Sequence, residues 1–365
     1  MFRDRLVTAL RHACAHPRTP AYGGAPATRP VDARLEDAAW VANARQEASQ
    51  VMLLDLSKNA AAVTASGSIA WVSTEHAAEL GAVDDDTVLL GRRKADALPK
   101  SFLNERYARV AQNQWCFAST IDSAEQASTS GNAIAGFAGL RELVATAPAA
   151  DASLAGQARN LLLWHRNHRW CGRCGGVNLS AKAGWKRVCT ACGAAHFPRT
   201  DPVIISAVLN PAGTKCLLGR QATWPPGRFS CLAGFVDPGE TLEEAVCREV
   251  REEASVRLAR DSITYHASQP WPNGPAGQLM LGFVAVAESE ALSVDDDELE
   301  TAQWVDVAEV RAALAGSVAQ ASGGGTGYGQ GSHVGGLMLP APSAIANVLL
   351  STACEAARRA HEQGG

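Results

Sequence analysis

The sequence predicts an α+β chain in three consecutive parts: an N-terminal α+β domain over 1–150, a four-cysteine module over 160–198, and a mixed sheet packed by helices over 199–365. Three observations predict this architecture. Short β-rich runs alternate with segments of helical periodicity in both halves of the chain. Two Cys-x-x-Cys pairs stand close together between the halves. No apolar run approaches the ~18 residues of a membrane-spanning helix, so we expect no membrane partner.

The composition is that of an ordinary globular protein. The 365 residues are 47% hydrophobic and 19% charged, which argues against a disordered, collagenous or coiled-coil chain. A net charge of −4 excludes a protein that is basic throughout, as a wholesale nucleic-acid binder would be. Ten cysteines are few for this length, so no disulfide scaffold is expected. The first residues lack the apolar core of a secretory signal, and we therefore expect a cytoplasmic protein.

The first domain shows structure but no recognisable chemistry. Alternating residues over 51–56 and 69–72 indicate strands, and 136–147 indicates a helix. A second helix is expected over 153–170, because apolar residues recur there at helical spacing and end directly before the first cysteine pair.

The cysteine module predicts a structural zinc site. Two Cys-x-x-Cys pairs separated by fourteen residues can place four thiolates tetrahedrally around one Zn²⁺ per chain, with no open coordination position. A redox pair or chance spacing is the alternative. The predicted ligands are Cys171, Cys174, Cys189 and Cys192. The tight turns of the two pairs are expected to use Gly172, Gly175 and Gly193.

Basic residues surround the cysteine pairs, among them Arg166, Arg169, Arg173, Lys182, Lys186 and Arg187. A nucleic-acid role for this module is one interpretation. A basic surface on a scaffolding element is the other, and it is the one we favour at this point.

The third part alternates strands with few helices. β-rich runs lie at 203–209, 215–219, 229–236 and 279–286. One strong helix is expected near 242–254, and a C-terminal helix near 343–361. Nine glycines over 316–336 give the composition of a flexible linker, which we prefer to a phosphate-binding loop because no strand-then-helix pattern surrounds them.

The helix near 242–254 carries carboxylates on its inward face. Thr241 and Glu244 form a capping-box pattern that starts the helix. At about 100° per residue, Glu249 and Glu253 fall on the apolar face, with Glu252 at its margin.

Such a face is not the usual solvated surface of a Glu-rich helix. Buried carboxylates cost several kcal/mol each unless they are paired or bind a metal. Three of them at i, i+3 and i+4 would repel one another without cations between them. Because all donors are oxygens, Mg²⁺ or Mn²⁺ is expected, and such ions bind phosphates and activate water.

This stretch resembles the Nudix box, G-x5-E-x7-R-E-U-x-E-E-x-G-U, where U is aliphatic. The matching residues are Gly234, Glu240, Arg248, Glu249, Val250, Glu252, Glu253 and Val256. Ser255 stands where the box has its second glycine, and this departure bears on the end of the helix rather than on the ligands. The resemblance implies a Nudix fold, a mixed β-sheet sandwiched by α-helices.

Further segments are similar to a narrower family, the zinc-containing NADH pyrophosphatases. They lie at 163–175, 197–204, 268–272, 298–304 and 339–346. Ser268-Gln-Pro-Trp-Pro272 matches the first half of that family's S-Q-P-W-P-F-P-x-S signature, and the second half departs. The resemblance covers residues 160–365 well and 1–150 only by the order of the domains.

The resemblance implies metal-dependent hydrolysis of the diphosphate bond of NADH or NAD⁺ to a nicotinamide mononucleotide and AMP. Glu249, Glu252 and Glu253 would hold the cations, and Glu253 would also orient or deprotonate water. Glu298 would add a ligand or base from another loop, or else belong to a solvated acidic loop. Arg248 would pair with Glu240 and fix the helix against the preceding loop.

Substrate contacts are implied in the same way. Phe235 would stack on a base, with Phe197 as the opposite wall. Gln269 and Trp271 would set dinucleotide preference near the interface of a homodimer, although core packing is an equal alternative for Trp271. The segment that ends at Ala346 would line the adenine end.

Two alternatives remain open. The same chemistry could act on NAD-capped RNA, for which the basic module is the motivating feature, or on other adenine dinucleotides. A catalytically silent nucleotide or RNA sensor is the second alternative, and the intact set of carboxylates argues against it.

Overall fold

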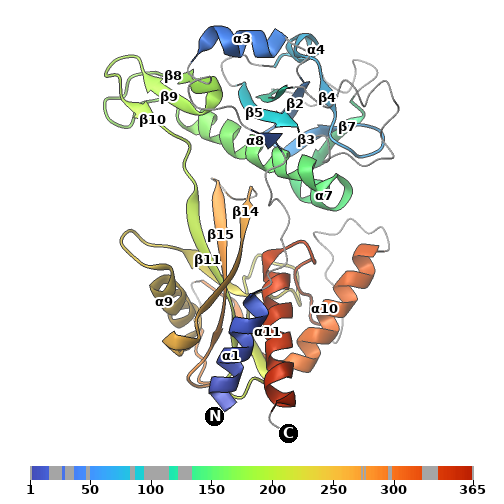
Figure 1. The fold of residues 1–365 in the computed structure, drawn as a ribbon, viewed down its shortest axis with the longest axis vertical. Coiled ribbons are helices and arrows are strands. Elements are labelled where there is room, and N and C mark those ends of the chain that lie inside the picture. Colours follow the sequence, from blue (N-terminus) through green and yellow to red (C-terminus); the bar gives the residue numbers. More distant parts are fainter. Residues whose placement is uncertain are drawn as a thin grey trace. The chain divides into compact units, whose positions relative to one another are not determined.

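The computed structural model divides the chain into two compact units. Unit 1 comprises residues 1–23, 201–270 and 278–365, and unit 2 comprises 24–200 and 271–277. The structure describes residues 2–15, 27–28, 37–46, 50–82, 87–93, 115–121, 134–272, 274, 277–294, 298–322 and 336–363. Each unit is built around its own sheet (Figure 1).

Unit 2 begins with a seven-stranded mixed sheet in the order β1-β5-β6-β2-β3-β7, with β4 paired to β2. Its strands are β1 (Ala27–Thr28), β2 (Gln50–Asp55), β3 (Ala60–Val63), β4 (Trp71–Val72), β5 (Val88–Arg93), β6 (Trp115–Thr120) and β7 (Gly136–Gly139). Its helices are α3 (Ala38–Gln46), α4 (Thr74–Glu79), α7 (Leu140–Thr146) and α8 (Ala149–Asn167).

Helices cover both faces of this sheet. Met52 and Leu54 of β2 share one apolar cluster with α8, whereas Val51 and Leu53 share the other with α3 and α4. The alternation follows from the two-residue repeat of a strand. The expected α8 is confirmed, and its periodic apolar residues are buried.

The prediction of a helix over 136–147 is correct only for its second part. Residues Gly136–Gly139 form β7, which pairs antiparallel with β3, and only Leu140–Thr146 are helical. Two glycines in four residues disfavour a helix, and the free edge of β3 offers hydrogen bonds instead.

The cysteine module forms a small three-stranded antiparallel sheet at the end of unit 2. Its strands are β8 (Asn178–Ala181), β9 (Lys186–Cys189) and β10 (Ala195–His196), in the order β10-β9-β8. The 3-10 helix η4 (Lys182–Gly184) joins the first two strands.

Unit 1 contains a six-stranded mixed sheet in the order β14-β15-β11-β12-β16, with β13 paired to β11. The strands are β11 (Asp201–Leu209), β12 (Lys215–Arg220), β13 (Leu232–Phe235), β14 (Thr264–Trp271), β15 (Gln278–Val286) and β16 (Thr301–Asp306). The helices are α1 (Phe2–Cys14), α9 (Leu242–Ala254), η5 (Arg260–Ser262), α10 (Val307–Ser322) and α11 (Ile345–Glu362).

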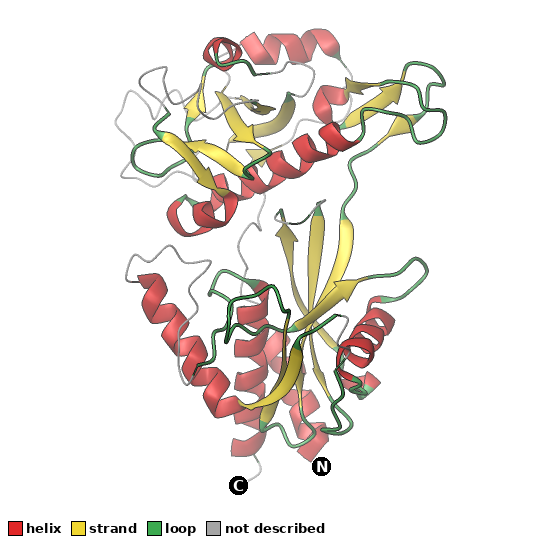
Figure 2. Ribbon diagram, turned by 180° about the vertical axis from the view of Figure 1, so that it is seen from behind, coloured by secondary structure: helices red, strands yellow, loops and turns green. Residues whose placement is uncertain are grey.

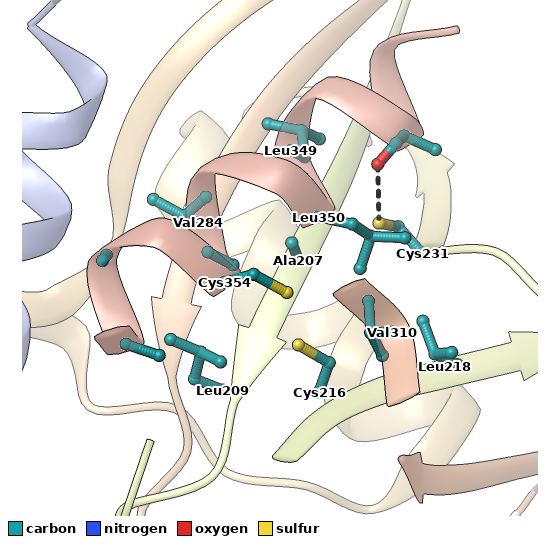
Figure 3. Packing of buried hydrophobic residues seen from close by; sticks show 14 of the residues in the cluster. Ala207, Leu209, Cys216, Leu218, Cys231, Val284, Val310, Leu349, Leu350 and Cys354 are labelled. Carbon is teal, nitrogen blue, oxygen red and sulfur yellow. Dashed lines mark hydrogen bonds between the residues drawn. The ribbon is translucent and has the colours of Figure 1, made fainter. Parts of the chain in front are cut away.

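Residues of β11 alternate between two cores. Ile204 and Val208 pack with α9, whereas Ala207 and Leu209 pack with α1, α10 and α11. Helices therefore lie on both faces of the sheet, as Figures 1 and 2 show. Figure 3 shows the second core, where Leu349 and Leu350 of α11 approach the strand residues.

Two boundaries differ from the expected ones. Helix α1 belongs to unit 1, because its apolar face packs against α11 in the same core. The expected flexible segment 316–336 is helical as far as Ser322, since α10 continues through an alanine-rich run of high helix propensity. Residues 323–335 lie outside the described part. Among the described residues, no helix is both long and apolar enough to cross a bilayer.

Candidate active site and zinc centre

A strand, a turn and a helix build the candidate active site within unit 1. Strand β13 pairs antiparallel with β11 and ends at Phe235. Helix α9 then begins as predicted: the Thr241 hydroxyl accepts a hydrogen bond from the Glu244 amide, and the Glu244 carboxylate accepts one from the Thr241 amide at 2.9 Å. This capping box fixes where the helix starts and therefore which side chains face inward.

The predicted inward face of α9 is confirmed. Ala245, Val246 and Val250 are fully buried against the sheet. Glu249 and Glu253 share this face and are only 8% and 7% exposed. The sheet therefore covers two carboxylates that water would otherwise stabilise, at a cost that some partner has to offset.

Glu298 completes a three-carboxylate cluster. It lies in the loop before β16, and one carboxylate oxygen from each of Glu249, Glu253 and Glu298 lies within 4.8 Å of the others. Three acceptor-only groups at this separation repel one another when ionised. An oxygen-binding divalent cation fits this donor set.

Glu253 is the member of the cluster whose carboxyl group is most affected by burial. Burial, and next the charges of Glu249 and Glu298, raise the pKa of the Glu253 carboxyl to about 8. Its Oε2 atom is buried and has no hydrogen-bond partner in the described part of the chain. Burial also raises the pKa of Glu249. A buried carboxylate oxygen without a donor is a suitable ligand for a divalent cation.

Gly234 leaves room for the cluster. A Cβ atom at this position would stand 1.9 Å from Glu249 Cδ and 2.0 and 2.1 Å from its two oxygens. The first glycine of the box is therefore required because the Glu249 carboxylate lies against the strand backbone. The sequence pattern contained this residue, but its role depends on a contact that only the structure shows.

Arg248 connects the helix to the loop before it. Its guanidinium donates to both oxygens of Glu240, at 2.7 and 2.9 Å, as the resemblance implied. It also donates to the Phe235 carbonyl oxygen at 2.8 Å and to Glu249 at 2.9 Å. The carboxylate of Glu240, and next those of Glu252 and Glu249, raise the pKa of Arg248. The Arg248 side chain thus links strand β13 to helix α9.

Glu252 lies outside the three-carboxylate cluster. Its carboxylate is exposed and accepts a hydrogen bond from Arg248 at 3.0 Å. The structure thus brings together Glu249, Glu253 and Glu298 rather than the three helix glutamates expected from spacing. The reason is the margin position of Glu252, which places it beside the arginine.

The end of α9 explains the departure from the box. Ser255 adopts the left-handed conformation, with φ of 56°, and its amide donates to the Arg251 carbonyl oxygen at 2.8 Å. A glycine adopts this conformation without the steric cost that a side chain adds. The substitution therefore affects the helix terminus, as the sequence indicated.

The residues expected to contact substrate differ in exposure. Phe235 is 50% exposed in unit 1, and Phe197 is 58% exposed in unit 2. Trp271 is half-buried at the end of β14.

Two further expected contacts are buried. The side-chain amide of Gln269 donates to the Ser343 carbonyl oxygen at 3.0 Å, and its oxygen accepts from the backbone N–H of Ile345 at 2.9 Å. This side chain therefore holds the start of α11. Ala346 packs in the core, and its carbonyl oxygen accepts a hydrogen bond from Cys231 (Figure 3). Neither side chain is presented to solvent, because helix packing covers both.

The four cysteines of unit 2 converge as predicted. The Sγ atoms of Cys171 and Cys192 are 3.8 Å apart, and those of Cys174 and Cys189 are 3.5 Å apart. All four lie within 4.8 Å of one another. A tetrahedral Zn²⁺ with bonds of about 2.3 Å needs S···S distances of about 3.8 Å, so the residues fit a closed structural zinc site.

Glycines close the two cysteine turns, although not all those expected. Gly175 and Gly193 have positive φ, 74° and 71°, at equivalent positions of the two pairs. Gly172 lies in the first turn, but it has no such φ and a Cβ there would meet no atom of the described residues within 4 Å, so the turn does not require a glycine at this position. Gly176, which the sequence reasoning missed, lets the pairs approach: a Cβ there would lie 2.8 Å from Ala191 Cβ and 3.0 Å from Cys189 Sγ.

Three family models match consecutive parts of the chain. The model of the NADH pyrophosphatase-like rudimentary NUDIX domain matches residues 49–164, that of the NADH pyrophosphatase zinc ribbon domain matches 166–197, and that of the NUDIX domain matches 199–322. The expected Nudix fold and zinc ribbon are thereby confirmed, and the first domain, which showed no chemistry in its sequence, is itself NUDIX-like.

Three curated relatives are between 39% and 44% identical to this chain over the aligned residues. Nudix hydrolase 19, chloroplastic, of Arabidopsis thaliana is 44% identical over 49% of this chain and 43% of its own length. NAD(P)H pyrophosphatase NUDT13, mitochondrial, of Homo sapiens is 42% identical over 49% and 50%. NAD-capped RNA hydrolase NudC of Mycobacterium bovis is 39% identical over 56% and 62%. The chain thus spans about half the length of these relatives.

Proposed function

We propose, for a chain that belongs to the zinc-ribbon-containing Nudix hydrolases of the NADH pyrophosphatase family, that it hydrolyses the diphosphate bond of NADH or NAD⁺. The products would be a nicotinamide mononucleotide and AMP, with one water consumed. The observation that carries the proposal is the cluster of two buried carboxylates, Glu249 and Glu253, with the exposed Glu298, in which Glu253 Oε2 has no hydrogen-bond partner among the described residues. The name of the human relative supports the substrate class.

The oxygen donors favour Mg²⁺ or Mn²⁺ as the divalent cation. When bound, such a cation neutralises the diphosphate and lowers the pKa of water. Glu249, Glu253 and Glu298 would hold it, and Glu253 Oε2 would accept the proton of the attacking water. Glu252 would contribute to the cation site through its hydrogen bond to Arg248. Arg248 would in turn hold the Glu249 carboxylate in position.

Binding of the substrate would use the exposed ring of Phe235, on which a base can stack. Phe197 and Trp271 would take the parts in substrate binding that the family resemblance implies, and the protein would act as a homodimer in the cytoplasm. Gln269 would act indirectly, through the segment that it holds before α11.

A second substrate is favoured by a specific observation. The zinc ribbon is basic, and the mycobacterial relative is named an NAD-capped RNA hydrolase. The same chemistry would release nicotinamide mononucleotide and leave a 5′-monophosphate on the RNA.

One experiment tests both substrates. The full chain is incubated with Mg²⁺ or Mn²⁺ and a panel of NADH, NAD⁺, other adenine dinucleotides and capped RNA, and mass spectrometry identifies the products. Cation-dependent release of mononucleotides is expected. Glu253→Gln should keep the fold and lower turnover by orders of magnitude, because it removes the proton acceptor. Wild-type turnover in this variant, or no product from any substrate, would refute the proposal.

A further inference from the structure

The zinc ribbon presents an apolar face to solvent. Strand register aligns Leu179 of β8 with Val188 of β9 and Val188 with Ala195 of β10. Residues opposite each other in antiparallel strands point to the same side, so these three side chains form one row. Trp170 bridges to Val177, two residues before Leu179, and extends the row.

The largest side chains of this face are exposed. Trp170 is 67% and Leu179 is 53% exposed. The opposite face of the same sheet is buried: Arg187 donates to His165 Nδ1 at 2.7 Å and to the Asn178 carbonyl oxygen at 2.8 Å. The ribbon therefore packs by one face against α8 and exposes the other to solvent. We call this outward face the ribbon face, defined by Trp170, Val177, Leu179, Val188 and Ala195.

The segment that carries the ribbon face is basic. Residues 152–200 contain no Asp or Glu, in a chain whose net charge is −4. They contain Arg159, Arg166, Arg169, Arg173, Lys182, Lys186, Arg187 and Arg199. Lys186 lies two residues before Val188 and so shares the ribbon face. This excess outweighs the formal charge of about −2 of a zinc centre with four thiolates.

An exposed tryptophan and aliphatic side chains on a sheet, in a segment rich in Lys and Arg, match the chemistry of single-stranded nucleic acid. Unstacked bases lie on aromatic rings while the phosphates meet Lys and Arg. A second copy of this chain fits less well, because a two-fold contact through the ribbon face would bring its cations against themselves. Double-stranded RNA would not expose bases to Trp170.

We propose that the ribbon face binds single-stranded RNA, as the body of a capped substrate. The role in substrate selection rests on the proposed function, but the binding itself does not. The ribbon face would hold nucleotides of the RNA body, whereas free NADH has no such nucleotides and would not use it.

The test measures binding separately from hydrolysis. Fluorescence anisotropy follows the zinc-loaded full chain with an unstructured, uncapped oligoribonucleotide of about 12 nucleotides. Trp170→Ala should weaken the affinity at least about fivefold, through loss of base stacking. Tyr265→Ala is the matched control, since Tyr265 is an aromatic residue that is 49% exposed in unit 1. It should bind as the wild type does.

A charge variant gives a second readout. Lys186→Gln should reduce the dependence of log affinity on log salt by about 0.7, the slope of one phosphate contact on a single strand. Lys58→Gln removes an exposed charge elsewhere in unit 2 and should leave the slope unchanged. Zinc content and circular dichroism of the variants verify that the ribbon is intact.

Rates of hydrolysis on free NADH and on capped RNA test RNA binding by the ribbon face independently of the proposed function. Trp170→Ala should keep the rate on free NADH and raise KM for capped RNA. Failure of the wild type to hydrolyse any dinucleotide would refute the proposed function while the anisotropy result still stands. Unchanged RNA affinity in both Trp170→Ala and Lys186→Gln would overturn the inference. A change of molecular mass in Trp170→Ala with unchanged RNA affinity would also overturn it and show a self-association surface.

Discussion

Adding one methyl group at Gly234 should disable the carboxylate cluster without unfolding the protein. In Gly234→Ala the new Cβ would meet Glu249 Cδ at 1.9 Å, whereas ordinary contact begins at 3.4 Å. The carboxylate therefore has to retreat by about 1.5 Å, and cation sites tolerate ligand displacements of only about 0.2 Å. We expect turnover to fall about 100-fold, as for a misplacement of this size near reacting atoms.

The fold should survive because the displaced atoms are the end of a flexible side chain. Gly136→Ala is the matched control: it adds the same methyl group to a strand, where no described atom beyond the chain neighbours lies within 4 Å of the new Cβ. Turnover of dinucleotides, Mn²⁺ affinity by calorimetry and thermal unfolding are measured for both variants. If Gly234→Ala kept wild-type turnover and Mn²⁺ affinity, the assignment of Glu249 to the cation site would be refuted.

Three further predictions follow from single residues. Ser255→Gly should stabilise unit 1 by about 1 kcal/mol, because it relieves the left-handed conformation, and should leave turnover unchanged; a lowered midpoint of thermal unfolding would contradict this. Without added Mg²⁺ or Mn²⁺, the raised pKa of Glu253 means that its contribution to stability is complete below pH 4.5 and is lost as the pH rises through about 8. In Glu253→Gln the free energy of unfolding, measured by denaturation, should change less between pH 4.5 and about 8 than in the wild type. An equal dependence on pH in variant and wild type would contradict the burial argument. Gly176→Ala should lower the zinc content, measured by atomic emission, because its Cβ would lie 3.0 Å from Cys189 Sγ, whereas Gly172→Ala should keep the metal. Equal zinc in the two variants would rule out the close-approach explanation.

Local patterns predicted much of the candidate site. The capping box at Thr241 set the helix start, and the 3.6-residue period then placed Glu249 and Glu253 inward. Spacing also predicted the cysteine cluster, because each Cys-x-x-Cys turn is itself local. These features depend on residues within one turn or one helix, where sequence and geometry are closely linked.

Contacts between distant segments could not be read in this way. The periodicity of α1 shows an apolar face but not that α11, more than three hundred residues later, covers it. Helical spacing grouped Glu252 with the other glutamates, whereas Arg248 binds it outside the cluster. The side-chain amide of Gln269 holds the start of α11, a role that depends on the packing of distant elements rather than on a motif.

Direct measurement of cation binding tests the central claim, that Glu249, Glu253 and Glu298 jointly bind the divalent cation that hydrolysis requires. Mn²⁺ titration followed by electron paramagnetic resonance compares the wild type with Glu253→Gln and with Glu243→Gln, an exposed glutamate of the same helix. We expect Glu253→Gln to lose Mn²⁺ binding and Glu243→Gln to retain it. Equal Mn²⁺ binding by all three proteins would contradict the central claim.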